Sequence, residues 1–149
     1  MRLLIIGIFC LASFTVMAQG QPVQPALQAK YLPKEIKDLF IGMSKEELQK
    51  RHQALKESDV LGYPEENFEK GNVKTITYQF NNDSNSLYEF IVEYRNEATA
   101  IAVAKKLYKL PNDVSKKFPL AWKIKLKDGL TLKCWVFHNK ICIADESQF

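Results

Sequence analysis

The sequence lacks the residue patterns of the common catalytic and nucleotide-binding sites. It contains no GxSxG, HExxH, P-loop or dinucleotide-binding motif. The acidic residues of the segment from Asp59 to Glu69 do not follow the Asp-x-Asp-x-Asp-Gly order of a calcium loop. We therefore expect a non-enzymatic protein without a cofactor or a metal site.

Cysteine and histidine are also scarce, with three and two residues among 149. Cys134, His138 and Cys142 are four residues apart, a spacing that converges on a helix, but their segment has the composition of β-strands. They supply only three ligands and no CxxC pair. A small secreted hydrolase or metal-dependent enzyme using His138 and these cysteines is therefore the alternative hypothesis and not the main one.

Long apolar runs are absent except at the start of the chain. Arg2, the apolar residues 3–16 and the Val16-Met17-Ala18 sequence predict a signal peptide at residues 1–18. No later stretch qualifies as a transmembrane segment, so we expect a periplasmic or secreted protein. Loss of Arg2 would lower the formal net charge from +4 to +3. Since Lys and Arg form no concentrated run, nucleic acid is not an expected partner.

The remaining chain divides into a tether and one domain. Residues 19–30 contain Pro22 and Pro25 among Gln and Ala, without hydrophobic periodicity, and predict a flexible tether. Residues 31–149 have the length of a single domain, and 46% of the whole chain is hydrophobic, which suffices for a core. Pro33 predicts the first turn of a short helix at the start of this domain.

A second helix is predicted from Ser44 to about Leu55, because Ser44 and Glu47 have the spacing of a capping box. The sequence from Ile41 to Leu48, IGMSKEEL, resembles the Gly-Met-Ser/Thr-x-x-Glu-Val/Leu helix start of exported bacterial proteins with the BamE or β-lactamase-inhibitor-protein fold. In those proteins two small helices lead into an antiparallel sheet. The resemblance implies a binding or scaffolding module of the cell envelope. The chain departs from that pattern at residues 51–54, where Leu-Gly-x-Pro is absent, and in having a third helix between its strands.

Alternating apolar residues predict a hairpin of strands 73–80 and 87–94, in which Tyr88, Phe90, Val92 and Tyr94 point inward. Asn96 is a suitable N-cap for a helix over residues 97–110, which ends before Pro111. Residues 121–145 then predict a meander of three strands. With Gly129 in the left-handed position of a three-residue turn, Trp122 faces Cys134 and Ile124 faces Leu132.

The opposite face of the meander is the candidate binding surface. In this register Lys123, Lys125, Lys133 and Trp135 point away from the apolar face, and exposed aromatics beside cations are typical of contact surfaces. We expect this face to recognise a protein or an anionic component of the cell envelope.

The second turn of the meander leaves two registers open for Cys134 and Cys142. A three-residue turn over residues 137–139 sets the two cysteines opposite each other, so that an oxidising compartment could join them in a disulfide. A two-residue turn, His138-Asn139, instead adds Ile141 and Ile143 to the buried face and turns Cys142 outward.

These elements together predict a small α+β domain. Its antiparallel sheet has about five strands, from the hairpin and the C-terminal three-stranded meander, and three helices pack on one face.

Overall fold

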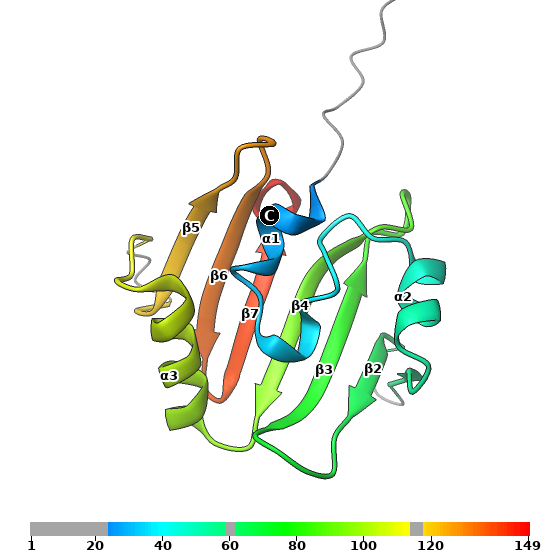
Figure 1. Ribbon diagram of the computed structural model, residues 1–149, viewed down its shortest axis with the longest axis horizontal. Coiled ribbons are helices and arrows are strands. Elements are labelled where there is room, and N and C mark those ends of the chain that lie inside the picture. Colours follow the sequence, from blue (N-terminus) through cyan, green and yellow to red (C-terminus); the bar gives the residue numbers. More distant parts are fainter. Residues whose placement is uncertain (1–23, 59–61, 114–117) are drawn as a thin grey trace, which may run out of the picture.

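The computed structural model describes residues 24–58, 62–113 and 118–149. The expected signal peptide at residues 1–18, with Cys10, lies outside the described residues. The described chain forms an α+β fold around an open sheet of antiparallel strands in the order β1-β2-β3-β4-β7-β6-β5 (Figure 1). The strands are β1 (Lys56–Glu57), β2 (Pro64–Asn67), β3 (Val73–Phe80), β4 (Leu87–Tyr94), β5 (Ala121–Lys125), β6 (Thr131–Phe137) and β7 (Lys140–Asp145).

The helices are short, and the longest follows β4 and precedes β5 in the sequence. They are α1 (Pro25–Ala29), the 3-10 helix η1 (Lys34–Ile36), α2 (Lys45–Arg51), α3 (Glu97–Tyr108) and the 3-10 helix η2 (Glu146–Gln148). Figure 1 shows α1, η1 and α3 on one face of the sheet, which we call the helix face, and α2 beside β2. We call the opposite side of the sheet the outer face.

The predicted register of the first meander turn is confirmed. Trp122 pairs with Cys134 and Ile124 with Leu132. Gly129 has φ +91°, and its N–H donates to the Leu126 carbonyl at 3.2 Å, which closes the expected three-residue turn. The hairpin strands begin and end as predicted, but a bulge lies between Gln79 and Phe80. The expectation that Tyr88 points inward was therefore wrong, and its neighbour Leu87 is the buried residue.

The described residues form a sheet of seven strands, more than the five predicted. The two additional strands, β1 and β2, lie at one edge in a stretch that was expected to be a loop. Pro64 and two glutamates give β2 the composition of a loop, so its sequence does not predict a strand. It becomes one because the free edge of β3 offers unpaired backbone groups, with which residues 65–67 pair in register.

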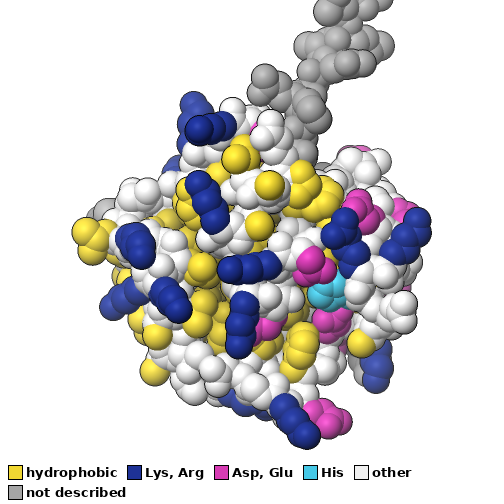
Figure 2. Space-filling model, in the orientation of Figure 1, with side chains coloured by type: hydrophobic (Ala, Val, Ile, Leu, Met, Phe, Trp, Pro, Cys, Tyr) yellow, Lys and Arg dark blue, Asp and Glu magenta, His cyan; other side chains and the backbone are white. Residues whose placement is uncertain are grey.

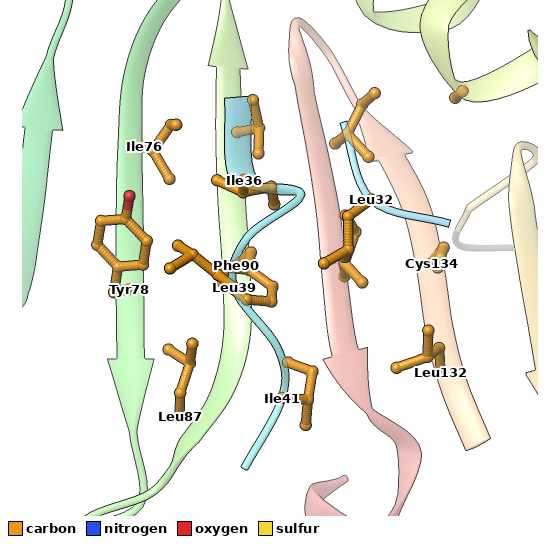
Figure 3. Close-up of a cluster of buried hydrophobic side chains, with 14 of the residues drawn as sticks. Leu32, Ile36, Leu39, Ile41, Ile76, Tyr78, Leu87, Phe90, Leu132 and Cys134 are labelled. Carbon is orange, nitrogen blue, oxygen red and sulfur yellow. The ribbon is translucent and has the colours of Figure 1, made fainter. Parts of the chain in front are cut away.

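The segment between α1 and α2 fills the helix face although little of it is helical. Figure 3 shows Leu32, Ile36, Leu39 and Ile41 of this segment directed at side chains of β3, β4 and β6. All four side chains are at most 3% exposed. The predicted first helix is thus reduced to a single 3-10 turn. The segment does not need a helix, because burial of its apolar side chains holds an irregular chain in place equally well.

The described part of the predicted tether is ordered. Residues 25–29 form α1, and Gln28 is completely buried. The Gln28 side chain accepts a hydrogen bond from the Ile41 N–H at 2.7 Å and donates one to the Ile41 carbonyl at 3.2 Å. The expectation of a flexible tether up to residue 30 was wrong, because this pair of hydrogen bonds attaches α1 to the core.

Helix α3 packs on the sheet through small residues. Its Ala100 and Ala104 are fully buried, and the helix contacts β4, β6 and β7. The Asn96 side chain accepts a hydrogen bond from the Thr99 N–H at 2.8 Å, which confirms the predicted N-cap. Among the helices of the described residues, none combines the length and the apolar character needed to cross a lipid bilayer.

Candidate functional site

The four residues of the predicted binding surface lie on one face of the sheet. Lys123 pairs with Lys133 across β5 and β6, and Trp135 pairs with Ala121. Trp135 belongs to a cluster separate from the main core, with Ala121, Cys142 and Ala144. These residues lie on the outer face, away from α1 and α3.

The sequence suggested that Trp135 is an exposed contact residue, but the structure shows that it is buried. Only 9% of it is exposed. The ring of Phe118 packs at 5.7 Å between centroids, and the ring of Phe149 meets the indole edge-on at 5.8 Å. Two phenylalanines from outside the meander strands therefore cover the indole.

The lysines of this face differ in their environments. Lys123 forms an ion pair with Glu146, and this interaction is the main cause of the raised pKa of the Lys123 ammonium group. Lys133 lies over the ring of Phe149, 5.9 Å from its centroid. Lys125 is exposed and forms no ion pair with a described residue. The row of lysines carries less free positive charge than its sequence implies.

Exposed apolar area on this face comes from two phenylalanines instead. Phe137 is 51% exposed and Phe149 is 67% exposed, and the only other large hydrophobic residue of the described chain that is classed as exposed is Leu110. Phe118 joins them, because its ring contacts those of both Phe137 and Trp135. We call the continuous surface of Phe118, Trp135, Phe137 and Phe149, with Lys123, Lys125 and Lys133, the aromatic face.

The two cysteines do not form a disulfide. The turn between β6 and β7 is the two-residue one, since Phe137 pairs with Lys140 and His138 takes a positive φ of 53°. Cys134 therefore pairs with Ile143 and points into the core, whereas Cys142 pairs with Trp135 on the outer face. Both thiols are free, and burial raises the pKa of each to about 12.

The structure does not bring His138 together with these cysteines. His138 lies exposed in the turn, and its ring meets that of Phe137 edge-on, with 4.3 Å between the ring centroids. Within the described residues, no group of three His, Cys, Asp or Glu side chains has the arrangement of a metal site. The alternative enzyme hypothesis thus finds no support in the arrangement of His138, Cys134 and Cys142.

A cluster around His52 was missed by the sequence analysis, which placed this histidine on a solvated helix surface. His52 Nδ1 lies 2.6 Å from Glu66 Oε1, and Nε2 lies 3.3 Å from Asp38 Oδ2. The Glu66 side chain is only 8% exposed and that of His52 is 13% exposed. Figure 2 shows a histidine flanked by acidic side chains on the helix face.

Tyr78 forms the floor of the His52 cluster. Its ring meets the imidazole edge-on at 6.3 Å, and its hydroxyl is buried without a hydrogen-bond partner. Burial, and then the charges of Glu66 and Asp38, raise the pKa of Tyr78. The hydroxyl is thus close enough to the Glu66 carboxylate to be affected by its charge.

The chemistry of the His52 cluster favours a structural role. Each ring nitrogen of His52 lies within hydrogen-bonding distance of a carboxylate, so neither nitrogen is free to face a substrate. Asp38 precedes α2, His52 follows it, and Glu66 lies on β2. The histidine therefore joins the N-terminal segment to β2, next to the edge strand of the sheet. No periodic signal marks this contact, because its members are 14 residues apart in the sequence.

Glu89 is a second buried carboxyl group that the sequence did not reveal. It lies on the outer face, between Gln79 of β3 and Ala144 of β7, and is 6% exposed. No ion pair or hydrogen bond to its carboxylate is formed by the described residues. Burial raises its pKa to about 7.

Comparisons of the chain with family models, with curated proteins and with solved structures find no match in any of the three.

Proposed function

We propose that this protein is an exported, non-enzymatic binding module of the bacterial cell envelope, and that its aromatic face recognises a partner protein. The observation that carries the proposal is the exposure of Phe137 and Phe149 beside the covered Trp135. Aromatic residues are enriched in protein interfaces, and a connected group of them on one sheet face provides an apolar contact area. The resemblance of residues 41–48 to envelope proteins of the BamE type agrees with such a role.

A protein partner is favoured over an anionic envelope component because of the charges on this face. Glu146 neutralises Lys123, and Glu93 accepts ion pairs from Lys74 and Lys140. Lys125 and Lys133 remain at the margin of the aromatic cluster. An apolar centre with a few charges at its rim is the usual composition of a protein interface, whereas an anionic polymer would require more unpaired cations.

The proposal can be tested by crosslinking from within the aromatic face. A photoreactive phenylalanine analogue replaces Phe137 in one protein and Leu110, which is 85% exposed at the end of α3, in the control. We expect a discrete crosslinked protein from position 137 only, in an envelope extract. An excess of unlabelled wild-type protein should abolish that product, whereas an excess of the Phe137→Ser, Phe149→Ser double variant should not.

Two results would contradict the proposal. Equal crosslinking from positions 137 and 110 would show that the aromatic face has no special affinity. If the protein instead captures a lipid or glycan in a salt-sensitive manner and no crosslinked protein forms, the partner is an anionic envelope component and not a protein.

A further inference from the structure

A cavity of about 330 Å³ opens on the helix face between η1 and α3. Its walls are apolar and come from both sides: Leu32 and Pro33 precede η1, and Val103 and Leu107 belong to α3. Small-ligand sites commonly measure about 300–1,000 Å³, so this cavity suits one short alkyl chain or a single ring system.

The mouth of the cavity is positively charged. Lys34 and Lys37 contribute from the η1 side and Lys106 from α3, against the single carboxylate of Glu35 among the lining residues. Glu35 is 3.9 Å from Lys34, whereas Lys37 and Lys106 form no ion pair with a described acidic residue. Figure 2 shows Lys and Arg side chains around hydrophobic surface on this face of the protein. Two unpaired ammonium groups thus stand beside an apolar cavity.

Tyr94 adds an unsatisfied hydrogen-bond donor to the lining. The residue is 2% exposed, and its hydroxyl has no hydrogen-bond partner. Burial, together with the charge of Glu35, raises its pKa, so the hydroxyl stays protonated and able to donate. Buried polar atoms of native proteins are nearly always paired, and this unpaired hydroxyl belongs to a residue that lines the cavity.

From these three features we infer that the cavity binds a small single-chain anionic amphiphile, of which a medium-chain carboxylate is the simplest example. The alkyl chain packs among Leu32, Val103 and Leu107. The carboxylate is attracted by Lys37 and Lys106, and Tyr94 supplies an uncharged donor to a ligand oxygen. This site lies on the opposite side of the sheet from the aromatic face, and neither depends on the other.

The inference is tested by titrating the protein with decanoate below its micelle concentration, by calorimetry and by ¹⁵N chemical-shift mapping. We expect saturable binding of one decanoate, with shift changes in η1 and α3. Decanol has the same chain without the charge, and loss of its attraction to two surface ammonium groups should weaken binding about tenfold. Equal affinity for decanol and decanoate, or binding that does not saturate, would overturn the inference.

A matched pair of charge reversals separates the cavity from general positive charge. Lys106→Glu reverses a lining residue, whereas Lys105→Glu makes the same change next to it on α3, outside the lining. Lys106→Glu should weaken decanoate binding about fivefold and Lys105→Glu less than twofold. The same loss in both variants would show that only the net charge matters and would overturn the inference.

Tyr94→Phe provides a readout that a purely structural role would not produce. Removing an unpaired buried hydroxyl should leave the unliganded protein as stable as the wild type, or more stable, while decanoate affinity falls. Loss of stability with unchanged affinity would overturn the role of Tyr94. The Phe137→Ser, Phe149→Ser variant should bind decanoate normally, so a failure of the cavity is distinguishable from a failure of the aromatic face.

Discussion

Replacement of Glu89 by glutamine should make this protein more stable at neutral and alkaline pH. The carboxyl group is buried on the outer face, and burial raises its pKa to about 7 from its ordinary value of 4.5. Below pH 4.5 the group is protonated in both the folded and the unfolded chain, so it has no effect on stability there. As the pH rises toward 7, the unfolded chain ionises first, and the folded state loses stability relative to it.

The size of the effect follows from the two pKa values. Each unit of difference corresponds to about 1.4 kcal/mol, so the free energy of unfolding of the wild type should fall by about 2.5 kcal/mol between pH 5 and pH 8 through this group alone. Glutamine has the same shape and does not ionise. Glu89→Gln should therefore be close to the wild type at pH 5 and about 3 kcal/mol more stable at pH 8.

Urea denaturation at pH 5, 6, 7 and 8 measures this difference as a shift of the midpoint at constant slope. Two titratable side chains lie near Glu89, Tyr88 on its own strand and Cys142 on β7. The pKa of both is raised mainly by burial, so they stay neutral over this range.

Glu93→Gln, on the same strand and face, is the matched control. Burial would raise the Glu93 pKa, but the hydrogen bond from Lys74 and the charges of Lys74 and Lys140 outweigh it and lower the pKa. Its ionised form thus stabilises the folded state at neutral pH, and this contribution is lost as the pH falls through the lowered pKa. Glu93→Gln should destabilise the protein at pH 8 by about 0.5–1 kcal/mol, since the group is partly exposed. If Glu89→Gln shows the same stability difference from the wild type at pH 5 and pH 8, burial does not shift Glu89 and the reasoning is wrong.

Three further predictions concern stability and thiol chemistry. His52→Ala should lower the free energy of unfolding at pH 7 by about 2–4 kcal/mol, because the Glu66 carboxylate stays buried without its partner. Urea titrations measure this loss, and a value below about 0.5 kcal/mol would contradict the role of His52 as a structural link. Gly129→Ala should cost about 1–2 kcal/mol from the positive φ alone, as nothing lies within 4 Å of the added methyl group, and unchanged thermal unfolding would disprove the strain. Cys134 and Cys142 should react with a thiol reagent only after unfolding, without any reductant, and an intact mass two hydrogens below the free-thiol value would instead reveal a disulfide.

The local structure of the sheet was largely predictable from the sequence. Alternation of apolar residues predicted β3 and β4 with correct bounds, and Gly129 predicted the turn that sets Trp122 opposite Cys134. Such features depend on neighbours in the sequence, where a period of two and the special backbone freedom of glycine act directly. The choice between the two turns at His138 needed the pairing of β6 with β7, which the apolar pattern favoured but did not decide.

The candidate site was predicted less well, because exposure depends on residues far away in the chain. The strand pattern placed Trp135 on the outer face correctly. Phe118 and Phe149 cover the indole, so the exposed aromatic area of this face belongs to Phe137 and Phe149 and not to Trp135. Neither covering residue lies in the meander strands, and the spacing within those strands carries no information about them.

The sequence by itself determined the helix caps, the alternating strands and the glycine turn, since each of these is a preference of a short stretch of backbone. Only the tertiary structure decided which side chains became isolated from water. It brought His52 between Asp38 and Glu66 and opened an apolar cavity between η1 and α3. The physical reason is that desolvation and ion pairing depend on distances in space between residues that are remote in the chain.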